Sequence, residues 1–228
     1  MSCDSNALAL TEDETKTLRE ITKLSRKVKK LVIDAEEWNN KKAYAPTLLE
    51  IRNSQDHLMR FFAFKFGLRT DVPDSYPQDN LLKVKAHLYR AGYDSLDYLS
   101  VGITKNILKN LEPFSNDAIV AIIPEYYSRI LPDLDNISRT IAEIRASKDM
   151  DTKSDDFDRH IEAIEKLRLH NVGILGKMKS LIEFEARVKE QQEEERKAES
   201  RRDVKNMIIG GLIVGIIILI IQSIFQLY

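Results

Sequence analysis

Apolar residues recur at three- and four-residue steps along most of this chain, which is the spacing of one face of an α-helix. The first run predicts a helix over residues 12–42. Its apolar stripe consists of Leu18, Ile21, Leu24, Val28, Leu31, Val32 and Ala35. Pro46 suits the first turn of a second helix, which is expected to end near Gly67.

The same periodicity predicts more helices in the remainder of the first 150 residues. They are expected at 79–91, 94–111, 116–131 and 132–148, with a kink at Pro124 and a new helix start at Pro132. Strand patterns are almost missing outside the last segment of the chain. The sequence therefore predicts an all-α protein whose residues 1–150 form a cytoplasmic helical domain.

A long amphipathic helix is predicted to follow over residues 151–205. Its apolar seam fades after Val188 into "KEQQEEERKAESRRDVKN", where the pairs Glu185–Lys189 and Glu193–Lys197 have the four-residue spacing that supports a solvated helix. We interpret this part as a coiled-coil-like seam followed by a charged stalk.

Residues 206–228 are the most apolar part of the chain. No charged residue occurs from Met207 to Tyr228, and about 20 apolar residues suffice to cross a membrane. Arg201, Arg202 and Lys205 precede this segment, so the positive-inside bias predicts a single-pass, tail-anchored protein with its N-terminal domain in the cytoplasm. The lipid bilayer is then an expected partner.

Two glycines of this predicted anchor have the spacing of a contact between two membrane helices. Gly211 and Gly215 form a G-x-x-x-G step, which lets two membrane helices approach closely and would dimerise the protein. Glycine is also common in membrane helices without such a role, so both interpretations stay open.

The composition of the chain limits the kinds of chemistry that we expect of this protein. Of the 228 residues 31% are charged and 43% hydrophobic, and the net charge is −1, so no global attraction to nucleic acid is expected. The single cysteine excludes an internal disulfide. There is no metal-ligand spacing, P-loop, Gly-rich dinucleotide turn or nucleophile elbow. We therefore expect neither a metal nor a cofactor.

One polar cluster interrupts the apolar second helix. The hexamer "RNSQDH" contains Arg52, Asn53 and His57. Asn53 and His57 lie one turn apart, whereas Arg52 is about 140° around the helix from His57. A guanidinium and an imidazole together can bind a phosphate and exchange a proton near neutral pH. The alternative is the solvated side of an ordinary amphipathic helix, in which Arg52 pairs with Asp56.

This R-N-x-x-x-H hexamer within a helical protein resembles the signature of the HEPN superfamily. The resemblance covers one helix. It implies a dimer that cuts RNA without metal at a cleft between two subunits. In that reading Arg52 and His57 are catalytic and Asn53 has a supporting role. It also implies a toxin or defence function, with transfer RNA, messenger RNA or foreign RNA as the substrate.

A second polar feature is basic. In "KLSRKVKKL" the residues Lys23, Arg26, Lys27 and Lys30 share one helical face. Such a face can bind RNA phosphates or anionic headgroups, or it can simply be the solvated side opposite Leu24 and Val28.

Two functions follow from these patterns. The first is a membrane-tethered, HEPN-like, metal-independent ribonuclease that acts as a homodimer or higher homo-oligomer. The second is a non-enzymatic, tail-anchored helical scaffold or membrane-perturbing oligomer. Cleavage of RNA in the presence of a chelator distinguishes them.

Overall fold

The structure is a computed structural model that describes residues 9–146 and 154–226, with side chains described for 9–144 and 155–218. All elements in this part of the chain are helical, which confirms the all-α prediction. They are α1 (Glu12–Trp38), α2 (Ala45–Lys65), α3 (Tyr76–Leu111), α4 (Asn116–Ile122), the π-helix η1 (Tyr126–Ile130), α5 (Leu131–Ala146) and α6 (Ser154–Gln226).

The described chain divides into two compact units. The first contains residues up to 113 together with 123–176, and the second contains residues 114–122 together with 177–226. The predicted boundary between residues 150 and 151 lies outside the described residues.

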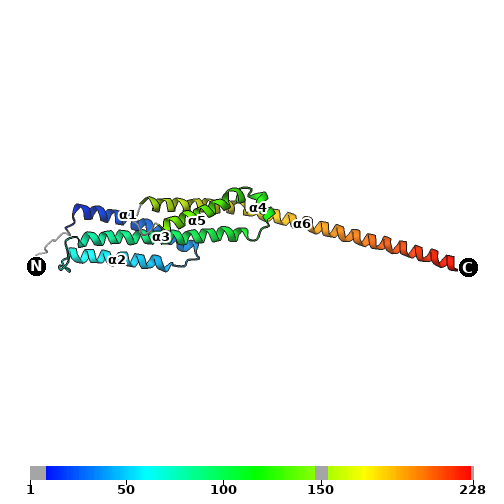
Figure 1. Cartoon of the computed structure of the whole chain (residues 1–228), viewed down its shortest axis with the longest axis horizontal. Coiled ribbons are helices and arrows are strands. Elements are labelled where there is room, and N and C mark those ends of the chain that lie inside the picture. The colour runs from blue at the N-terminus through cyan, green and yellow to red at the C-terminus, as the bar shows by residue number, and fades with distance from the viewer. Residues whose placement is uncertain (1–8, 147–153, 227–228) are drawn as a thin grey trace. The chain divides into compact units, whose positions relative to one another are not determined.

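In the first unit α3 lies between α1 and α2 and packs along both (Figure 1). One side of α3 is buried along its whole length, because apolar residues recur there at helical spacing. Its fully covered side chains are Leu81, Val84, Ala91, Leu96, Leu99, Ile103 and Ile107. Among the described helices, α3 therefore supplies the largest share of the buried apolar side chains.

α1 begins at a capping box. The Thr11 hydroxyl accepts a hydrogen bond from the Glu14 backbone N–H at 3.2 Å, and the Glu14 carboxylate accepts one from the Thr11 N–H at 2.8 Å. Glu14 is 4% exposed and also pairs with Lys65 of α2 at 2.6 Å. The start of α1 is thereby tied to the end of α2.

α3 is one continuous helix of 36 residues, so the predicted interruption between residues 91 and 94 is wrong. Gly92, which lies within the predicted interruption, has a packing role. A Cβ on Gly92 would lie 2.6 Å from the ring of Phe157 on α6. That ring also meets Tyr89 and Tyr93 edge-on. The helix needs a glycine here because an aromatic ring occupies the space of a side chain.

The helix predicted over 116–131 with a kink at Pro124 is instead two separate elements, which are interrupted around that proline. α4 ends at Ile122, and the chain resumes as η1, in which the N–H of Ile130 donates to the carbonyl of Glu125. Pro132 then lies in the first turn of α5, where its missing N–H costs no helical hydrogen bond.

The second unit is built from α4 and the later part of α6. The backbone N–H of Ser115, just before α4, donates to the Glu185 carboxylate at 2.6 Å. Hydrogen bonding from Ser115, by its side chain first and then by this backbone N–H, lowers the pKa of Glu185 below its ordinary value. From residue 189 to 214 the side chains of α6 are exposed throughout.

The prediction of a membrane-spanning helix over residues 206–228 is wrong, because none of the helices that the structure describes combines the length and apolarity that crossing a membrane needs. The described apolar side chains run from Met207 to Ile218. Side chains 219–228 lie outside the described residues. The predicted single-pass localisation, with the N-terminal domain in the cytoplasm, depended on this span and is therefore wrong as well.

Candidate acid–base site between α2 and α3

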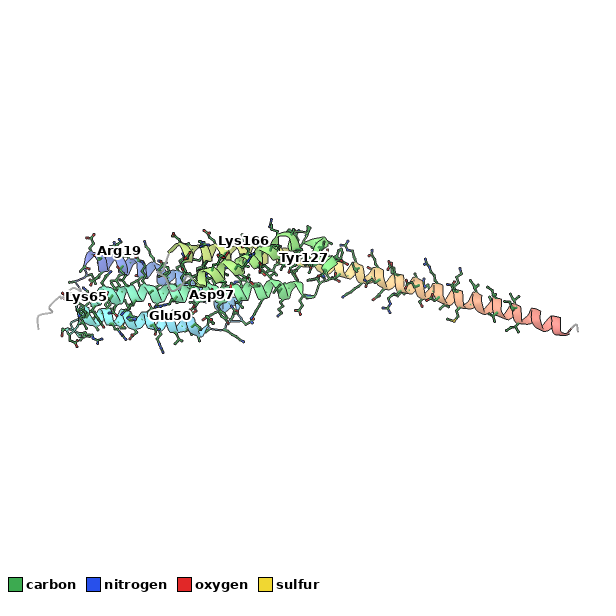
Figure 2. The ribbon with its side chains drawn as sticks, viewed as in Figure 1. Arg19, Glu50, Lys65, Asp97, Tyr127 and Lys166 are labelled. Carbon is green, nitrogen blue, oxygen red and sulfur yellow. The ribbon has the colours of Figure 1, made fainter. Side chains whose placement is uncertain are left out.

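The buried side of α2 determines which of its polar residues face α3. Thr47, Ser54 and Phe61 are buried at two-turn intervals. At about 100° per residue, Glu50 and His57 lie within roughly 60° of this buried line. Both side chains therefore point toward α3, Glu50 from the first third of α2, where Figure 2 labels it, and His57 from the middle of the helix.

His57 is held by an amide of α3. Its Nδ1 lies 2.9 Å from Oδ1 of Asn80, which is 3% exposed. The Asn80 amide cannot turn over, because its Nδ2 donates to the Tyr76 carbonyl at 2.8 Å. An amide oxygen only accepts hydrogen bonds. Nδ1 of His57 must therefore carry the proton, and in the neutral ring Nε2 has the free lone pair.

His87 of α3 is held in the same way by a carboxylate of α2. Its Nδ1 lies 2.6 Å from Oε2 of Glu50, and Nε of Arg90 lies 3.3 Å from the same oxygen. A carboxylate accepts, so Nδ1 of His87 also carries a proton. The contact of 3.2 Å between Arg90 and that Nδ1 joins two donors and is no hydrogen bond.

These four residues form a reciprocal arrangement, which we name the histidine pair: Glu50 and His57 on α2, Asn80 and His87 on α3. On each helix the acceptor precedes the imidazole by seven residues, or two turns. Because α2 and α3 run antiparallel, each acceptor meets the imidazole of the other helix. The two rings stack with centroids 5.2 Å apart and an angle of 16° between their planes.

Arg52 and His57 are not brought together within one chain. His57 is half-buried against α3, whereas Arg52 is exposed on the side of α2 that faces away from α3. Asn53 is half-buried beside His57. Asp56 pairs with Arg60 at 2.7 Å, so the alternative in which Asp56 pairs with Arg52 is not the one observed.

The basic face of α1 is exposed as expected, but one member has a partner. Lys27 pairs with Asp158 of α6 at 2.7 Å, and its amine lies 5.0 Å from the centre of the Phe157 ring. Lys23, Arg26 and Lys30 are exposed. Lys23 and Lys27 also line a groove of about 390 Å³ together with Lys85.

Gly211 and Gly215 lie on α6, where a Cβ on either would meet no atom within 4 Å. The close contact predicted for them belonged to the membrane span that the structure contradicts.

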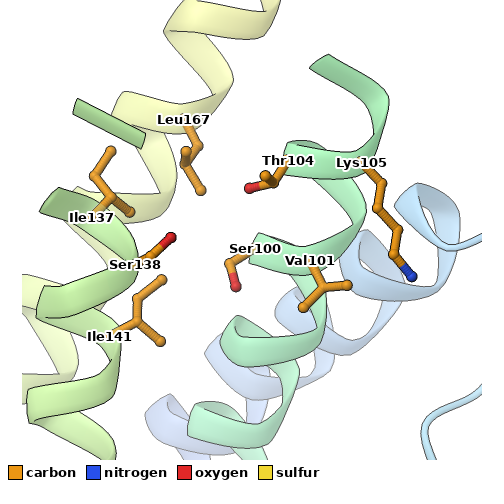
Figure 3. A pocket seen from close by; sticks show the side chains of 8 residues that line it. All are labelled: Ser100, Val101, Thr104, Lys105, Ile137, Ser138, Ile141 and Leu167. Carbon is orange, nitrogen blue, oxygen red and sulfur yellow. The ribbon is translucent and has the colours of Figure 1, made fainter. Parts of the chain in front are cut away.

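A separate cavity of about 340 Å³ lies between α3, α5 and α6 (Figure 3). It is lined by Ser100, Val101, Thr104, Lys105, Ile137, Ser138, Ile141 and Leu167. The Lys105 amine points away from it, and the Thr104 hydroxyl points in. The lining consists mainly of apolar side chains and the hydroxyl groups of Ser100, Thr104 and Ser138.

Within residues 9–146 and 154–226 no group of three or more His, Cys, Asp or Glu residues is placed to hold a metal ion.

Comparisons with protein-family models, with curated proteins and with solved structures found no match to this chain. The resemblance to the HEPN superfamily thus rests on the hexamer from Arg52 to His57 and on the helical fold.

Sequence reasoning found His57 but missed Glu50, Asn80, His87 and Arg90. The signal that could have found them is the shared two-turn spacing of Glu50 to His57 and of Asn80 to His87. That spacing becomes informative only when α2 and α3 are known to be antiparallel neighbours in this register.

Proposed function

We propose that this protein is a metal-independent ribonuclease in which His57 is the general base. The observation that carries the proposal is the fixed tautomer of His57. Because Asn80 holds the proton on Nδ1, Nε2 is the atom available to take the proton of a ribose 2′-hydroxyl. The resemblance of the Arg52–His57 hexamer to the HEPN signature supports RNA as the substrate.

Arg52 binds the scissile phosphate in this proposal, and it does so in the site of a second copy of the chain. Its position supports this assignment, since Arg52 is exposed and lies about 140° around α2 from His57 of its own chain. Large exposed apolar side chains share that side of the helix, at 46% for Leu48, 58% for Met59 and 65% for Phe66. Exposed apolar residues of this kind are typical of surfaces that another protein covers.

The test uses the full-length protein, total RNA and an excess of chelator. We expect the wild type to cleave RNA and His57→Gln to lose activity on the order of 100-fold or more. Arg52→Ala is expected to lose activity, while Arg60→Ala, which removes an exposed arginine from the same helix, keeps it. His170→Gln is the matched histidine control. Intact RNA after incubation with folded wild-type protein, or full activity in His57→Gln, would refute the proposal.

A mixing experiment tests the two-chain site. Arg52→Ala still supplies a histidine and His57→Gln still supplies an arginine. In a symmetric dimer, mixing equal amounts should restore about a quarter of the wild-type activity, because half of the dimers are mixed and each has one complete site. If the mixture stays as inactive as its components, the arginine and histidine do not come from different chains.

The second candidate function is a non-enzymatic helical scaffold. The observation in its favour is an exposed apolar stripe on α6 in the first unit, at 71% for Leu169, 65% for Val172 and 47% for Leu175. These residues follow one another at three-residue steps and so lie near one face of the helix. Self-association that Leu169→Glu abolishes, together with an intact RNA pool, would favour this function over the ribonuclease.

A further inference from the structure

The second imidazole of the histidine pair has the features that an acid–base group needs. His87 comes from a different helix than His57, and its Nδ1 is fixed by Glu50 at 2.6 Å. Its side chain is 15% exposed, so the ring is not sealed in the core. Because Nδ1 is engaged with Glu50, Nε2 is the ring atom that can meet a substrate.

The two imidazoles differ in the charge of the group that holds them. Asn80 offers His57 the dipole of a neutral amide. Glu50 offers His87 a carboxylate, and a carboxylate stabilises the imidazolium that a histidine becomes when it holds a second proton. Arg90 keeps this carboxylate in place through its contact at 3.3 Å. The environments thus favour different tasks for two otherwise equivalent rings.

Cleavage of RNA without metal requires both tasks. One group must take the proton of the 2′-hydroxyl, and another must give a proton to the 5′-oxygen that leaves. The rings stack at 5.2 Å between centroids, so the two groups that could perform these tasks lie next to each other.

We propose that His87, oriented by Glu50, is the general acid that protonates the leaving 5′-oxygen while His57 acts as the base. Nε2 of His57 removes the proton from O2′, O2′ attacks phosphorus, and the bond from phosphorus to O5′ breaks. Nε2–H of His87 gives its proton to O5′. The products are a 2′,3′-cyclic phosphate and a 5′-hydroxyl, and no metal or redox partner takes part. This inference rests on the proposed ribonuclease function.

The test compares two dinucleotide substrates that differ in the leaving atom. One has the natural 5′-oxygen, and the other has a bridging 5′-sulfur, which leaves without being protonated. For the oxygen substrate we expect His87→Gln and His57→Gln each to lose on the order of 100-fold or more. For the sulfur substrate His87→Gln should regain a rate close to that of the wild type, whereas His57→Gln should stay inactive.

Glu50→Gln gives a second, gentler variant, because it keeps His87 and changes only the charge of the group that orients it. We expect a smaller loss on the oxygen substrate and a rate equal to that of the wild type on the sulfur substrate. Circular dichroism and the melting temperature show whether each variant is folded.

The outcomes separate this inference from the function on which it rests. A wild type that cleaves neither substrate would overturn both. If His57→Gln is inactive but His87→Gln is fully active on the oxygen substrate, the ribonuclease stands and the role of His87 is refuted. An equal loss on both substrates for a folded His87→Gln would also refute it, because it would show that His87 only positions its neighbour.

Discussion

Gly102 is the position where a single added methyl group tests the packing of the first unit most directly. It lies in the last third of α3 against the end of α1, and an alanine Cβ there would come within 2.7 Å of the Asn39 amide nitrogen and 2.9 Å of the Trp38 carbonyl oxygen. The Asn39 amide donates to the carbonyls of Ala35 and Tyr98, both at 2.9 Å. It thereby joins the end of α1 to α3.

The expected cost of Gly102→Ala has two parts. Displacing the Asn39 amide loses two hydrogen bonds, each of about 1 kcal/mol. Crowding a backbone carbonyl that cannot rotate away adds about 1–3 kcal/mol. Replacing a helical glycine by alanine recovers about 1 kcal/mol. We therefore expect a net loss of about 2–4 kcal/mol in the free energy of unfolding.

The assay is thermal unfolding followed by circular dichroism. For a chain of this length about 1 kcal/mol corresponds to roughly 2–4 °C, so the melting temperature should fall by roughly 4–16 °C. The matched control is Gly173→Ala on α6, where a Cβ meets nothing within 4 Å and where stability should rise by up to about 1 kcal/mol. A Gly102→Ala protein as stable as the wild type would show that the α1–α3 contact is looser than described.

Three further predictions concern other parts of the first unit. Phe157→Ala should lower the free energy of unfolding, measured by chemical denaturation, by about 3–5 kcal/mol, because it leaves a cavity where the ring of this α6 residue packs against α3. A loss no larger than that of a surface variant would contradict the described packing. A hydrogen bond from Lys166, aided by His170, lowers the pKa of Asp133 below its ordinary value of 3.8, so the stability it gives is present above that pH and is lost as pH falls through the lowered pKa. Asp133→Asn should therefore flatten the acid side of the stability profile, and an unchanged slope would refute this. Burial raises the pKa of Tyr93 from 10.0 to about 12, so stability should fall as pH rises through that range, and Tyr93→Phe should reduce the slope.

The histidine pair shows how far a single sequence leads toward a site. The hexamer around His57 was recognisable because the arginine and histidine are close together along the chain. No such local signal marked the other three residues, because the contacts join residues far apart in the chain. His57 and Asn80 are 23 residues apart, and Glu50 and His87 are 37 residues apart. Their hydrogen bonds depend on the register of two antiparallel helices, which the periodicity of either helix alone leaves open.

The predicted membrane span shows the opposite case, where a local pattern led to a wrong conclusion. The uncharged composition of residues 206–228 indicated a span from hydropathy alone. In the structure residues 206–226 form the end of a helix of 73 residues, and no membrane-crossing helix occurs among the described residues.

The sequence by itself determined that this protein is helical and where most helices begin and end, because the spacing of apolar residues, the prolines and the caps act within a few residues of one another. The tertiary structure decided which helices are neighbours and in what register. It placed a ring against Gly92, kept Arg52 away from His57, and gave each imidazole an acceptor on the opposite helix. These outcomes depend on contacts between residues far apart in the chain, and such contacts exist only once the helices have packed.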